Sequence, residues 1–548
     1  MKIASPLLYL GLVLITSAAP ALHSANALQG SPEFRPSPEN PVGWRGDGTG
    51  RFPGAMPPLE WSRTRVGNGY ETKGIAWMTP LPDIGVSSPI AVGPLIFLTT
   101  EVADLVCLEK QSGRILWIRS NPEFEGISAE ERKENPLFAA HLEPVIPELT
   151  AASAELAKAD AELADTLNAQ IASAPASSFK LSAAALKKRE IEKKINTLQQ
   201  TADKAMQEEQ KKAEKKPEKF FDRYWGQAVF GFSGPTPTSD GKHVCAFFTT
   251  GISACYDLQG NRKWIHRGKG SGSEHGNFAS PLLAAGALVV WANEMRSYDV
   301  ESGKLLWSRP AKAFNTYGSL FRIQSGNDTV AAFQWGFFTR IRDGMAIWDS
   351  GIFGDSVQTP IVEGDTIFAR VGYPKNNNEV LGFRAFKIPP STDSGKLTPG
   401  PTFKMDWAED ELVVDKAKNP FDRGFVASPL FVDGLVYQLT QGGGLIVHEA
   451  ATGNTVYRKI LPLKPRTQYW NWAGASASPT LAGKYIYLMD NQGTTLIIEP
   501  GREYKAVRQN LIEESKDGKE QAQNLATPIF EGTRMYYRTP EYLYCIGK

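Results

Sequence analysis

One segment pattern recurs along this chain, and it constrains the fold more than any other feature of the sequence. Its clearest copy spans residues 279–307, where short apolar runs are separated by turns at Gly286 and Gly303. The copy opens with Ser280-Pro281 and ends with Leu305-Leu306-Trp307. Short apolar runs bounded by Gly, Ser, Asn and Asp are typical of strands joined by tight turns. The copy therefore predicts four short strands.

Seven further copies repeat the same order of features. One of them, around Gly326 and Trp348, lacks the opening dipeptide of Ser or Thr followed by Pro. In the other seven of the eight copies that dipeptide begins at Ser88, Thr236, Ser280, Thr359, Ser428, Ser478 and Thr527. Two intervals contain insertions, and otherwise the period of about 40–50 residues is that of a four-stranded propeller blade. In the copy that opens at Thr359 we place the outer strand at 404–407, after an insertion.

The last copy ends at Lys548 without a fourth strand. Residues 74–79 resemble the outer strand around Trp307 and belong to no other copy. Pairing them with the last copy closes the ring and removes exposed sheet edges. The sequence thus predicts an all-β, eight-bladed β-propeller of four-stranded antiparallel blades, closed by an N-terminal strand. Seven blades is the alternative, if the copy around Gly326 is not a blade.

The copies resemble the repeat of the pyrroloquinoline quinone (PQQ) enzyme-like, or quinoprotein alcohol dehydrogenase-like, β-propeller family. Its hallmarks are a small residue and Pro opening the inner strand, and a Gly turn before a Trp in the outer hairpin. Here the turn glycines are Gly113, Gly303 and Gly453. The resemblance implies that one Trp per blade packs between neighbouring blades, and large flat rings suit that role. The matching residues are Trp77, Trp117, Trp264, Trp307 and Trp348.

The N-terminal 73 residues precede the repeats. Residues 1–27 have the features of a signal peptide: Lys2, an apolar stretch over 6–15, and Ala25-Asn26-Ala27 at the end. The apolar stretch is short for a membrane span. We expect cleavage after Ala27, export to the periplasm or cell envelope of a bacterium, and no transmembrane segment afterwards. Residues 28–73 are rich in Pro and Gly, resemble the leader of exported planctomycete-type propellers, and are predicted to form an extended arm over the ring.

Residues 126–220 interrupt the repeat between blade 1, which with the closing strand covers 74–125, and blades 2–8, which cover 221–548. Within the insertion, 148–173 and 179–216 carry apolar residues at spacings of three and four, a heptad-like pattern. We predict an antiparallel, coiled-coil-like helical hairpin that projects between blades 1 and 2. Its charge runs predict a solvated surface. A partner-docking arm and a dimerising coiled coil are the alternatives.

Cysteine content and charge narrow the function classes. Three of the four cysteines, Cys107, Cys255 and Cys545, occupy equivalent strand positions, which favours small buried core residues. A disulfide is the alternative, which export would permit. The chain has no Cys-x-x-Cys-His motif for c-type haem. The formal net charge is +1, so no strong field favours nucleic acid or acidic lipid as a partner.

The loops that precede the inner strands are expected to ring the mouth of the central channel. Ligand pockets combine aromatic walls with a few polar groups, as these loops do. We therefore predict a ligand-binding mouth, while simple capping of the channel is the alternative. We assign no catalytic residue. We also assign no metal site, because no two of the six His are spaced i,i+2 or i,i+4. The candidate residues are Tyr224, Trp225, His275, Asn277, Tyr317, Asp355, Arg423, Trp470, Asn471 and Trp472.

The resemblance implies two different functions. Quinoprotein dehydrogenases of this family bind PQQ and calcium beside an adjacent Cys-Cys pair and an Asp base. This chain has no adjacent cysteines, and Asp355, Asp422, Asn277 and Asn471 match no motif of those enzymes. The propeller subunit of the outer-membrane protein assembly machinery has the same repeats, no cofactor, and binds proteins through its loops.

We therefore predict a non-catalytic binding or assembly scaffold for an envelope protein or a small ligand, with no cofactor. A dehydrogenase that uses PQQ with calcium is one alternative. A carbohydrate- or peptide-binding propeller is the other, in which Trp470 and Trp472 would stack on the ligand.

Overall fold

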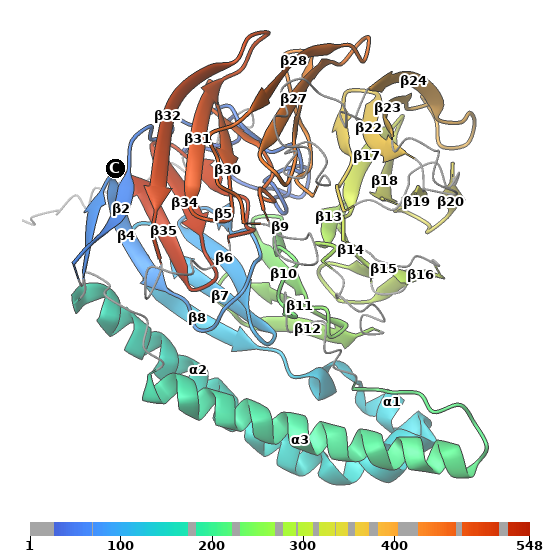
Figure 1. Ribbon diagram of the computed structural model, residues 1–548. Coiled ribbons are helices and arrows are strands. Elements are labelled where there is room, and N and C mark those ends of the chain that lie inside the picture. The colour runs from blue at the N-terminus through green and yellow to red at the C-terminus, as the bar shows by residue number, and fades with distance from the viewer. Residues whose placement is uncertain are drawn as a thin grey trace, which may run out of the picture.

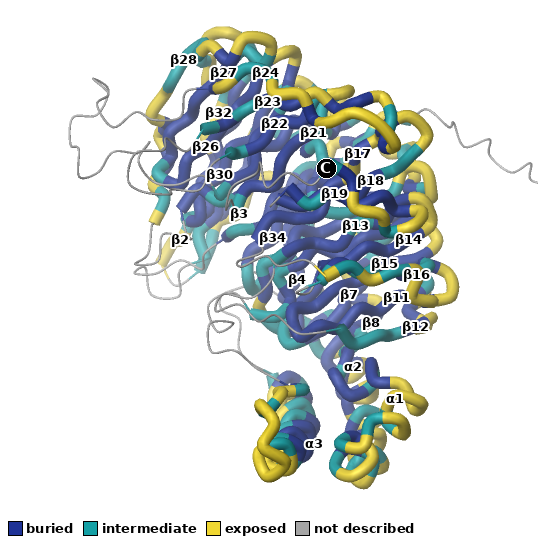
Figure 2. The backbone as a smooth tube through the Cα atoms, turned by 90° about the vertical axis from the view of Figure 1, so that its right-hand side faces the viewer, coloured by how far each residue is buried: buried dark blue, intermediate teal, exposed yellow. Residues whose placement is uncertain are grey.

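The computed structural model is a β-propeller whose blades are arranged around a central channel (Figure 1). Strand interiors are buried, while the turns at the outer rim are exposed (Figure 2). The structure describes residues 27–67, 69–173, 182–221, 231–268, 278–291, 294–310, 317–334, 336–348, 357–371, 382–403, 426–466, 474–514 and 524–548.

Blades 1 to 4 each contain four strands in chain order from the channel outwards. Blade 1 consists of β5 (Ile90–Val92), β6 (Leu95–Thr100), β7 (Asp104–Glu109) and β8 (Ile115–Ser120). Blade 2 consists of β9 (Thr238–Ser239), β10 (His243–Phe247), β11 (Ile252–Asp257) and β12 (Arg262–Arg267). Blade 3 consists of β13 (Leu282–Ala284), β14 (Ala287–Trp291), β15 (Glu294–Asp299) and β16 (Leu305–Pro310). Blade 4 consists of β17 (Phe321–Ser325), β18 (Asp328–Phe333), β19 (Phe337–Arg340) and β20 (Ala346–Ile347).

Blades 5 to 8 complete the ring. Blade 5 consists of β21 (Ile361–Glu363), β22 (Thr366–Val371), β23 (Gly382–Lys387) and β24 (Thr398–Phe403). Blade 6 consists of β25 (Leu430–Val432), β26 (Leu435–Leu439), β27 (Gly444–Glu449) and β28 (Thr455–Ile460). Blade 7 consists of β29 (Thr480–Ala482), β30 (Tyr485–Met489), β31 (Thr494–Glu499) and β32 (Lys505–Ile512). Blade 8 consists of β33 (Ile529–Glu531), β34 (Arg534–Arg538), β35 (Tyr542–Gly547) and β4 (Ile75–Pro80).

The N-terminal strand closes the ring as the sequence predicted. Strand β4 pairs antiparallel with β35 and places Trp77 opposite Cys545. The copy without the opening dipeptide forms blade 4, so the ring has eight blades and the seven-bladed alternative is wrong. Both predictions rested on the repeat, because a blade that lacks its outer strand must take one from elsewhere.

The outer strand of blade 5 was misplaced. It is β24, which ends at Phe403, immediately before the segment 404–407 that we predicted. Phe403 packs edge-on against Phe383, with 5.3 Å between the ring centroids. Pro399 and Pro401 obscured this strand in the sequence, and an edge strand tolerates proline because one side of it needs no ladder hydrogen bond. Residues 404–407 lie outside the described residues.

The turn glycines of blades 1 to 4 contact a tryptophan of the preceding blade. An added Cβ on Gly303 would overlap the Trp264 indole, and Gly113, Gly260 and Gly344 face Trp77, Trp117 and Trp307 in the same way. The Trp264 indole also donates a 2.9 Å hydrogen bond to the Val300 carbonyl of blade 3. These glycines have positive φ, from 71° to 82°, which only glycine adopts without strain.

We expect Gly303→Ala to destabilise the protein by roughly 1–2 kcal/mol more than Gly286→Ala. Both positions are in blade 3 with φ of +71° and +74°, so the backbone strain is matched. No atom of the described residues lies within 4 Å of a Cβ on Gly286, whereas Gly303 would displace Trp264. Urea unfolding midpoints of the two variants measure the difference, and equal losses would contradict the packing role of Trp264.

The insertion folds as the predicted helical hairpin. Its main helices are α2 (Ile146–Ser173) and α3 (Ala183–Lys212), which pack against each other. Four shorter helices precede them: η1 (Glu123–Gly126), α1 (Ala129–Glu134), η2 (Phe138–Leu142) and η3 (Glu143–Val145). No helix among the described residues is long and apolar enough to cross a membrane.

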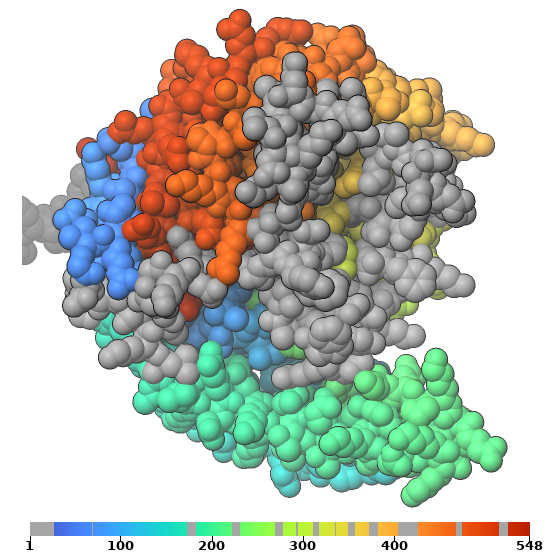
Figure 3. Space-filling model, in the orientation of Figure 1, coloured from blue at the N-terminus to red at the C-terminus, as the bar shows by residue number. Residues whose placement is uncertain are grey.

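We predicted that the hairpin projects from the ring between blades 1 and 2, and this prediction is wrong. The hairpin lies along the outer edge of blades 1 and 8, where α2 contacts β8 and β4, and it forms a ridge beneath the propeller (Figure 3). Asn168 of α2 bonds both backbone groups of Ile115 at 2.8 Å, and Asp160 accepts a bond from the Ser120 amide. Side chains of α2 thus satisfy the free edge of β8, which would otherwise be exposed. Leu163 and Leu167 join the core of these two blades.

The expectation for the cysteines holds for two and is wrong for one. Cys107 and Cys545 are buried free thiols, and burial raises the pKa of Cys545 to about 12. Cys255 instead forms a disulfide with Cys245. The two cysteines face each other across β10 and β11, with 4.1 Å between their Cα atoms. Only the strand register reveals this pairing, because the sequence gives just a separation of ten residues.

The arm crosses the face of the ring and contributes three strands. Strand β1 (Arg51–Phe52) pairs in parallel with β29 at the inner edge of blade 7. Strands β2 (Ser62–Val66) and β3 (Gly69–Lys73) form a hairpin on the outer edge of the same blade, next to β32. Blade 7 therefore becomes a seven-stranded sheet, and the arm covers both of its edges.

Candidate functional site

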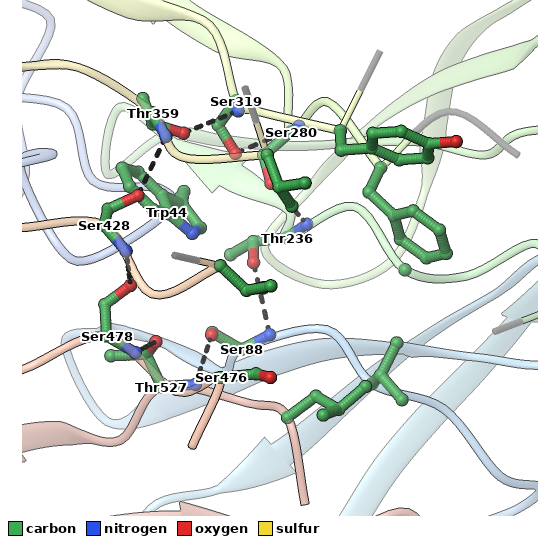
Figure 4. A pocket seen from close by; sticks show the side chains of 17 residues that line it. Trp44, Ser88, Thr236, Ser280, Ser319, Thr359, Ser428, Ser476, Ser478 and Thr527 are labelled. Atoms are coloured by element: carbon green, nitrogen blue, oxygen red, sulfur yellow. Dashed lines mark hydrogen bonds between the residues drawn. The ribbon is translucent and has the colours of Figure 1, made fainter. Parts of the chain in front are cut away.

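A closed ring of hydrogen bonds surrounds the channel axis (Figure 4). In each blade the backbone amide of the Ser or Thr that opens the inner strand donates to the hydroxyl of the equivalent residue in the next blade, at 2.8–3.3 Å. The last amide, of Thr527, donates to Ser88 and closes the circle. The ring residues are Ser88, Thr236, Ser280, Ser319, Thr359, Ser428, Ser478 and Thr527.

This ring explains why the repeat requires Ser or Thr at one position. A hydroxyl can accept the neighbouring amide and still donate its own proton, which Ala or Val cannot do. Blade 4 keeps the hydroxyl at Ser319 but has Leu320 in place of the proline. The Leu320 amide donates to the Ser280 carbonyl at 3.3 Å, so this departure from the repeat adds a bond to blade 3.

A second ring of residues lies two positions before the first. Residues two apart on an extended strand share a face, so both rings line the same cavity. The cavity has a volume of about 150 Å³. Trp44 of the arm also lines it, beside the hydroxyl ring (Figure 4). The members of the second ring are Val86, Gly234, Phe278, Tyr317, Val357, Val426, Ser476 and Leu525.

Arg45 holds Trp44 in place. Its buried guanidinium donates to the Pro429 carbonyl at 2.9 Å and to the Pro479 carbonyl at 2.7 Å, in blades 6 and 7. Burial lowers the pKa of Arg45 to about 9, although nearby Asp47 opposes this shift. Gly50 packs on the guanidinium and leaves no space for a side chain. The arm is therefore anchored at the axis next to the residue that lines the cavity.

Only one of the predicted mouth residues lies in the described part of the chain. Tyr317 is buried and lines the cavity beside Phe278. The other nine candidates lie outside the described residues: Tyr224, Trp225, His275, Asn277, Asp355, Arg423, Trp470, Asn471 and Trp472.

Sequence reasoning missed Trp44 and the hydroxyl ring as cavity residues. The recurrent Ser or Thr was visible as a repeat marker, and its alignment across copies was the available signal. Trp44 occurs once, in a segment without periodicity, so no pattern marked it.

The described lining of the cavity is uncharged. It combines hydroxyl, aromatic, aliphatic and glycine residues. PQQ is a tricarboxylate, and these residues offer no cation to pair with it and no carboxylate to hold calcium. Among the described residues no three His, Cys, Asp or Glu side chains gather as a metal site. The described residues therefore do not fit PQQ with calcium.

Two ionisable groups, the partly buried Glu101 and the buried Arg538, lie next to the cavity wall on the blade 1 side. The Glu101 carboxylate accepts bonds from the amides of Phe232 and Ser233 at 2.8–2.9 Å. Burial raises the pKa of Glu101 to about 7. Arg538 donates to the Ser87 carbonyl at 2.9 Å, and burial lowers its pKa to about 9. These groups fix the strand ends that carry the cavity residues Val86 and Gly234.

A further acid, the partly buried Glu514, lies between blades 7 and 8, and we predict that it makes stability depend on pH. Its carboxyl accepts bonds from Tyr544 at 2.6 Å and Thr539 at 2.8 Å, and burial raises its pKa from 4.5 to about 7. The folded protein therefore binds this proton more tightly than the unfolded chain, and stability falls as pH rises from 4.5 to 7. Glu514→Gln cannot ionise and should gain up to about 3 kcal/mol over the wild type across that range.

Urea unfolding at pH 5, 6, 7 and 8 measures this difference. The control is Glu71→Gln on β3, which makes the same substitution at an exposed side chain. A difference between Glu514→Gln and wild type that stays constant over this range would show that the acid is ionised throughout.

Comparisons with known proteins returned similar solved structures but no sequence relative. No family model matches the chain, and no curated protein matches it. Similar solved structures include BamB from Moraxella catarrhalis, at 13% identity over 57% of this chain and 80% of that one, with a TM-score of 0.39. The computationally designed Ika8 protein is 11% identical over 56% of this chain and 93% of that one, with a TM-score of 0.31. The C-terminal WD40 domain of Sif2 is 10% identical over 56% of this chain and 79% of that one, with a TM-score of 0.35. At these identities and TM-scores the matches assign no function to this chain.

Proposed function

We propose that the protein is a non-catalytic binding scaffold that receives an uncharged ring, from a small ligand or a partner's side chain, in the axial cavity. The observation that carries this proposal is the uncharged lining, with Trp44, Phe278 and Tyr317 around a circle of hydroxyl groups. General acid–base chemistry needs a titratable group within reach of the substrate. The described lining contains no carboxyl, imidazole or amine group, and its tyrosine, Tyr317, stands among aromatic, aliphatic and hydroxyl residues that supply surfaces for contact.

The lining also defines the chemistry of the ligand. Each ring hydroxyl already accepts an amide, so its remaining proton can donate to an acceptor inside the cavity. Aromatic faces favour flat or sugar-like rings by stacking. A volume of about 150 Å³ suits one such ring. An uncharged aromatic group or a sugar therefore fits better than a polyanionic cofactor.

The remaining parts of the proposal concern setting and partners. We propose that the mature scaffold acts after export to the periplasm or cell envelope, as the signal-like residues 1–27 imply. The resemblance to PQQ-like repeats adds that its partner there is an envelope protein. Dimerisation through the hairpin would have to use its outer surface, since Leu156 and Ile195 of its apolar seam are buried within the chain.

Binding titrations test this function. The probes are N-acetyltryptophanamide, methyl glucoside, and PQQ with calcium, each read by calorimetry and by thermal shift. We expect saturable binding of an uncharged probe, and Tyr317→Ala should weaken this binding at least about tenfold. Tyr485→Ala is the control and should leave the affinity unchanged, because Tyr485 is a half-buried tyrosine of blade 7 that does not line the cavity. Saturable binding of PQQ with calcium would instead favour the dehydrogenase, and binding of no probe up to about 1 mM would contradict a small-ligand site.

A further inference from the structure

A second, larger cavity lies on the arm side of the channel. This arm-side groove has a volume of about 490 Å³ and lies between the arm and the inner strands of blades 3, 4 and 5. Leu282, Arg322 and Val362 line it from the blades, and Asp47 lines it from the arm. Trp44 lines both this groove and the axial cavity, so its indole stands between the two.

On their channel side, the inner strands of blades 2 and 7 bind the backbone of the arm. In blade 7 the amides of Leu481 and Gly483 donate to the arm carbonyls of Gly50 and Phe52 at 2.9 and 3.0 Å. In blade 2, Ser239 and Val42 of the arm exchange two backbone bonds of 2.8 Å. Extended backbone is thus bound here by strand addition.

Blades 3 to 5 have edge positions equivalent to Leu481 and Ser239, and these positions line the groove. Leu481 and Ser239 are each the third residue after the ring hydroxyl of their blade. The equivalent residues are Leu283, Arg322 and Val362, which all line the groove. Because the blades repeat, their backbone groups face the channel as those of Leu481 do. Among the described residues, no arm backbone group bonds to the backbone of these three. The Arg322 side chain does contact the arm, since its guanidinium donates to the Glu39 carbonyl at 3.2 Å.

We propose that the arm-side groove binds an extended peptide segment of a partner protein, by strand addition to the inner strands of blades 3 to 5. The free edges would supply the affinity through backbone bonds. The half-buried side chains of Leu282 and Val362 would select small apolar residues at alternate positions of the peptide. The site is separate from the axial cavity, so the two can be tested independently.

The test uses a fluorescent, end-capped peptide with the sequence of residues 48–54, since this segment already pairs with the equivalent edge of blade 7. We expect saturable binding to the full chain by fluorescence anisotropy. A peptide N-methylated at the amide that corresponds to Phe52 keeps every side chain but loses that N–H donor and carries a methyl group at the pairing edge, so it should bind at least about tenfold more weakly. Val362→Arg should weaken binding by a similar factor. Leu306→Arg, on the exposed face of β16, should not.

Hydrogen exchange of the unmodified protein keeps the test decisive if Val362→Arg fails to fold. Peptide should slow exchange at the amides of Leu283, Arg322 and Val362 and leave Leu481 unchanged. Faster exchange at Leu481 would mean that the peptide displaces the arm, and would overturn the proposal. Equal binding of the N-methylated peptide, or no binding, would also overturn it. Binding by the 28–548 protein but not by the full chain would assign the groove to the chain's own N-terminal residues instead of a partner.

Discussion

Replacing Lys188 by Met is expected to lower the free energy of unfolding by about 3–5 kcal/mol. The Lys188 ammonium of α3 is buried at the contact between the hairpin and blade 1. It lies 3.0 Å from Asp104, 3.5 Å from Asp160 and 2.5 Å from Glu192. Removing this cation leaves the buried carboxylates of Asp104 and Asp160 and the partly buried carboxylate of Glu192 close together, and a buried charge without a partner is strongly destabilising.

The directions in which the pKa values of Lys188 and Asp104 are shifted agree with this arrangement. Burial alone would lower the pKa of Lys188, but the three carboxylates outweigh it and raise the pKa well above the usual range. Burial raises the pKa of Asp104, and the carboxylates of Asp160 and Glu192 add to the effect. The Lys188 ammonium therefore stays charged, and the three carboxylates share it as their partner.

Lys187→Met is the matched control, because it makes the same change one residue earlier on the same helix. Lys187 pairs with Glu162 at 2.6 Å, but both side chains are about half exposed, at 54% and 51%. Exposed pairs contribute at most about 1 kcal/mol. Urea unfolding measures both variants. Similar losses for Lys187→Met and Lys188→Met would show that Lys188 is not the ion that holds the hairpin to the propeller.

For the hairpin, the sequence predicted where the helices lie but did not predict which charged residue is buried. Apolar spacing located both helices to within a few residues, because it depends only on the helical period. The run Lys187-Lys188-Arg189 was predicted to be solvated, and that is true of Lys187 and Arg189 but wrong for Lys188. Which residue of a charged run is buried depends on how the helix is rotated against the blade, and the blade's contribution, Asp104, lies 84 residues away.

The propeller itself was largely predictable for a similar reason. Each blade repeats the same local contacts, so eight weak copies support one another, and the missing strand of blade 8 identified β4 as its complement. Features that occur once were not predictable. The Cys245–Cys255 disulfide depends on strand register, and the placement of Trp44 depends on how the arm folds back over the ring.

The arm gives the second large effect: Trp61→Ala is expected to lower the free energy of unfolding by about 3–5 kcal/mol. Trp61 is 2% exposed, belongs to the core of blades 1, 7 and 8, and stacks on Tyr487 with 6.3 Å between the ring centroids. The Asn510 side chain of β32 fixes the backbone on either side of this contact, by accepting from the Trp61 amide and donating to the Leu59 carbonyl at 3.1 Å. Truncation would leave a cavity that this fixed backbone cannot close.

Trp44→Ala is the control for this variant, since it makes the same substitution on the same arm. Trp44 is only half-buried and faces cavities on both sides, so its loss should cost less than half as much stability. The two variants should differ in the opposite sense in binding, because Trp44 lines the axial cavity and Trp61 does not. Unfolding midpoints together with probe titrations separate the two roles. Suppose that Trp44→Ala is as destabilising as Trp61→Ala and binds the probes normally. The indole of Trp44 would then have a structural role alone, and this result would contradict the axial cavity as the binding site.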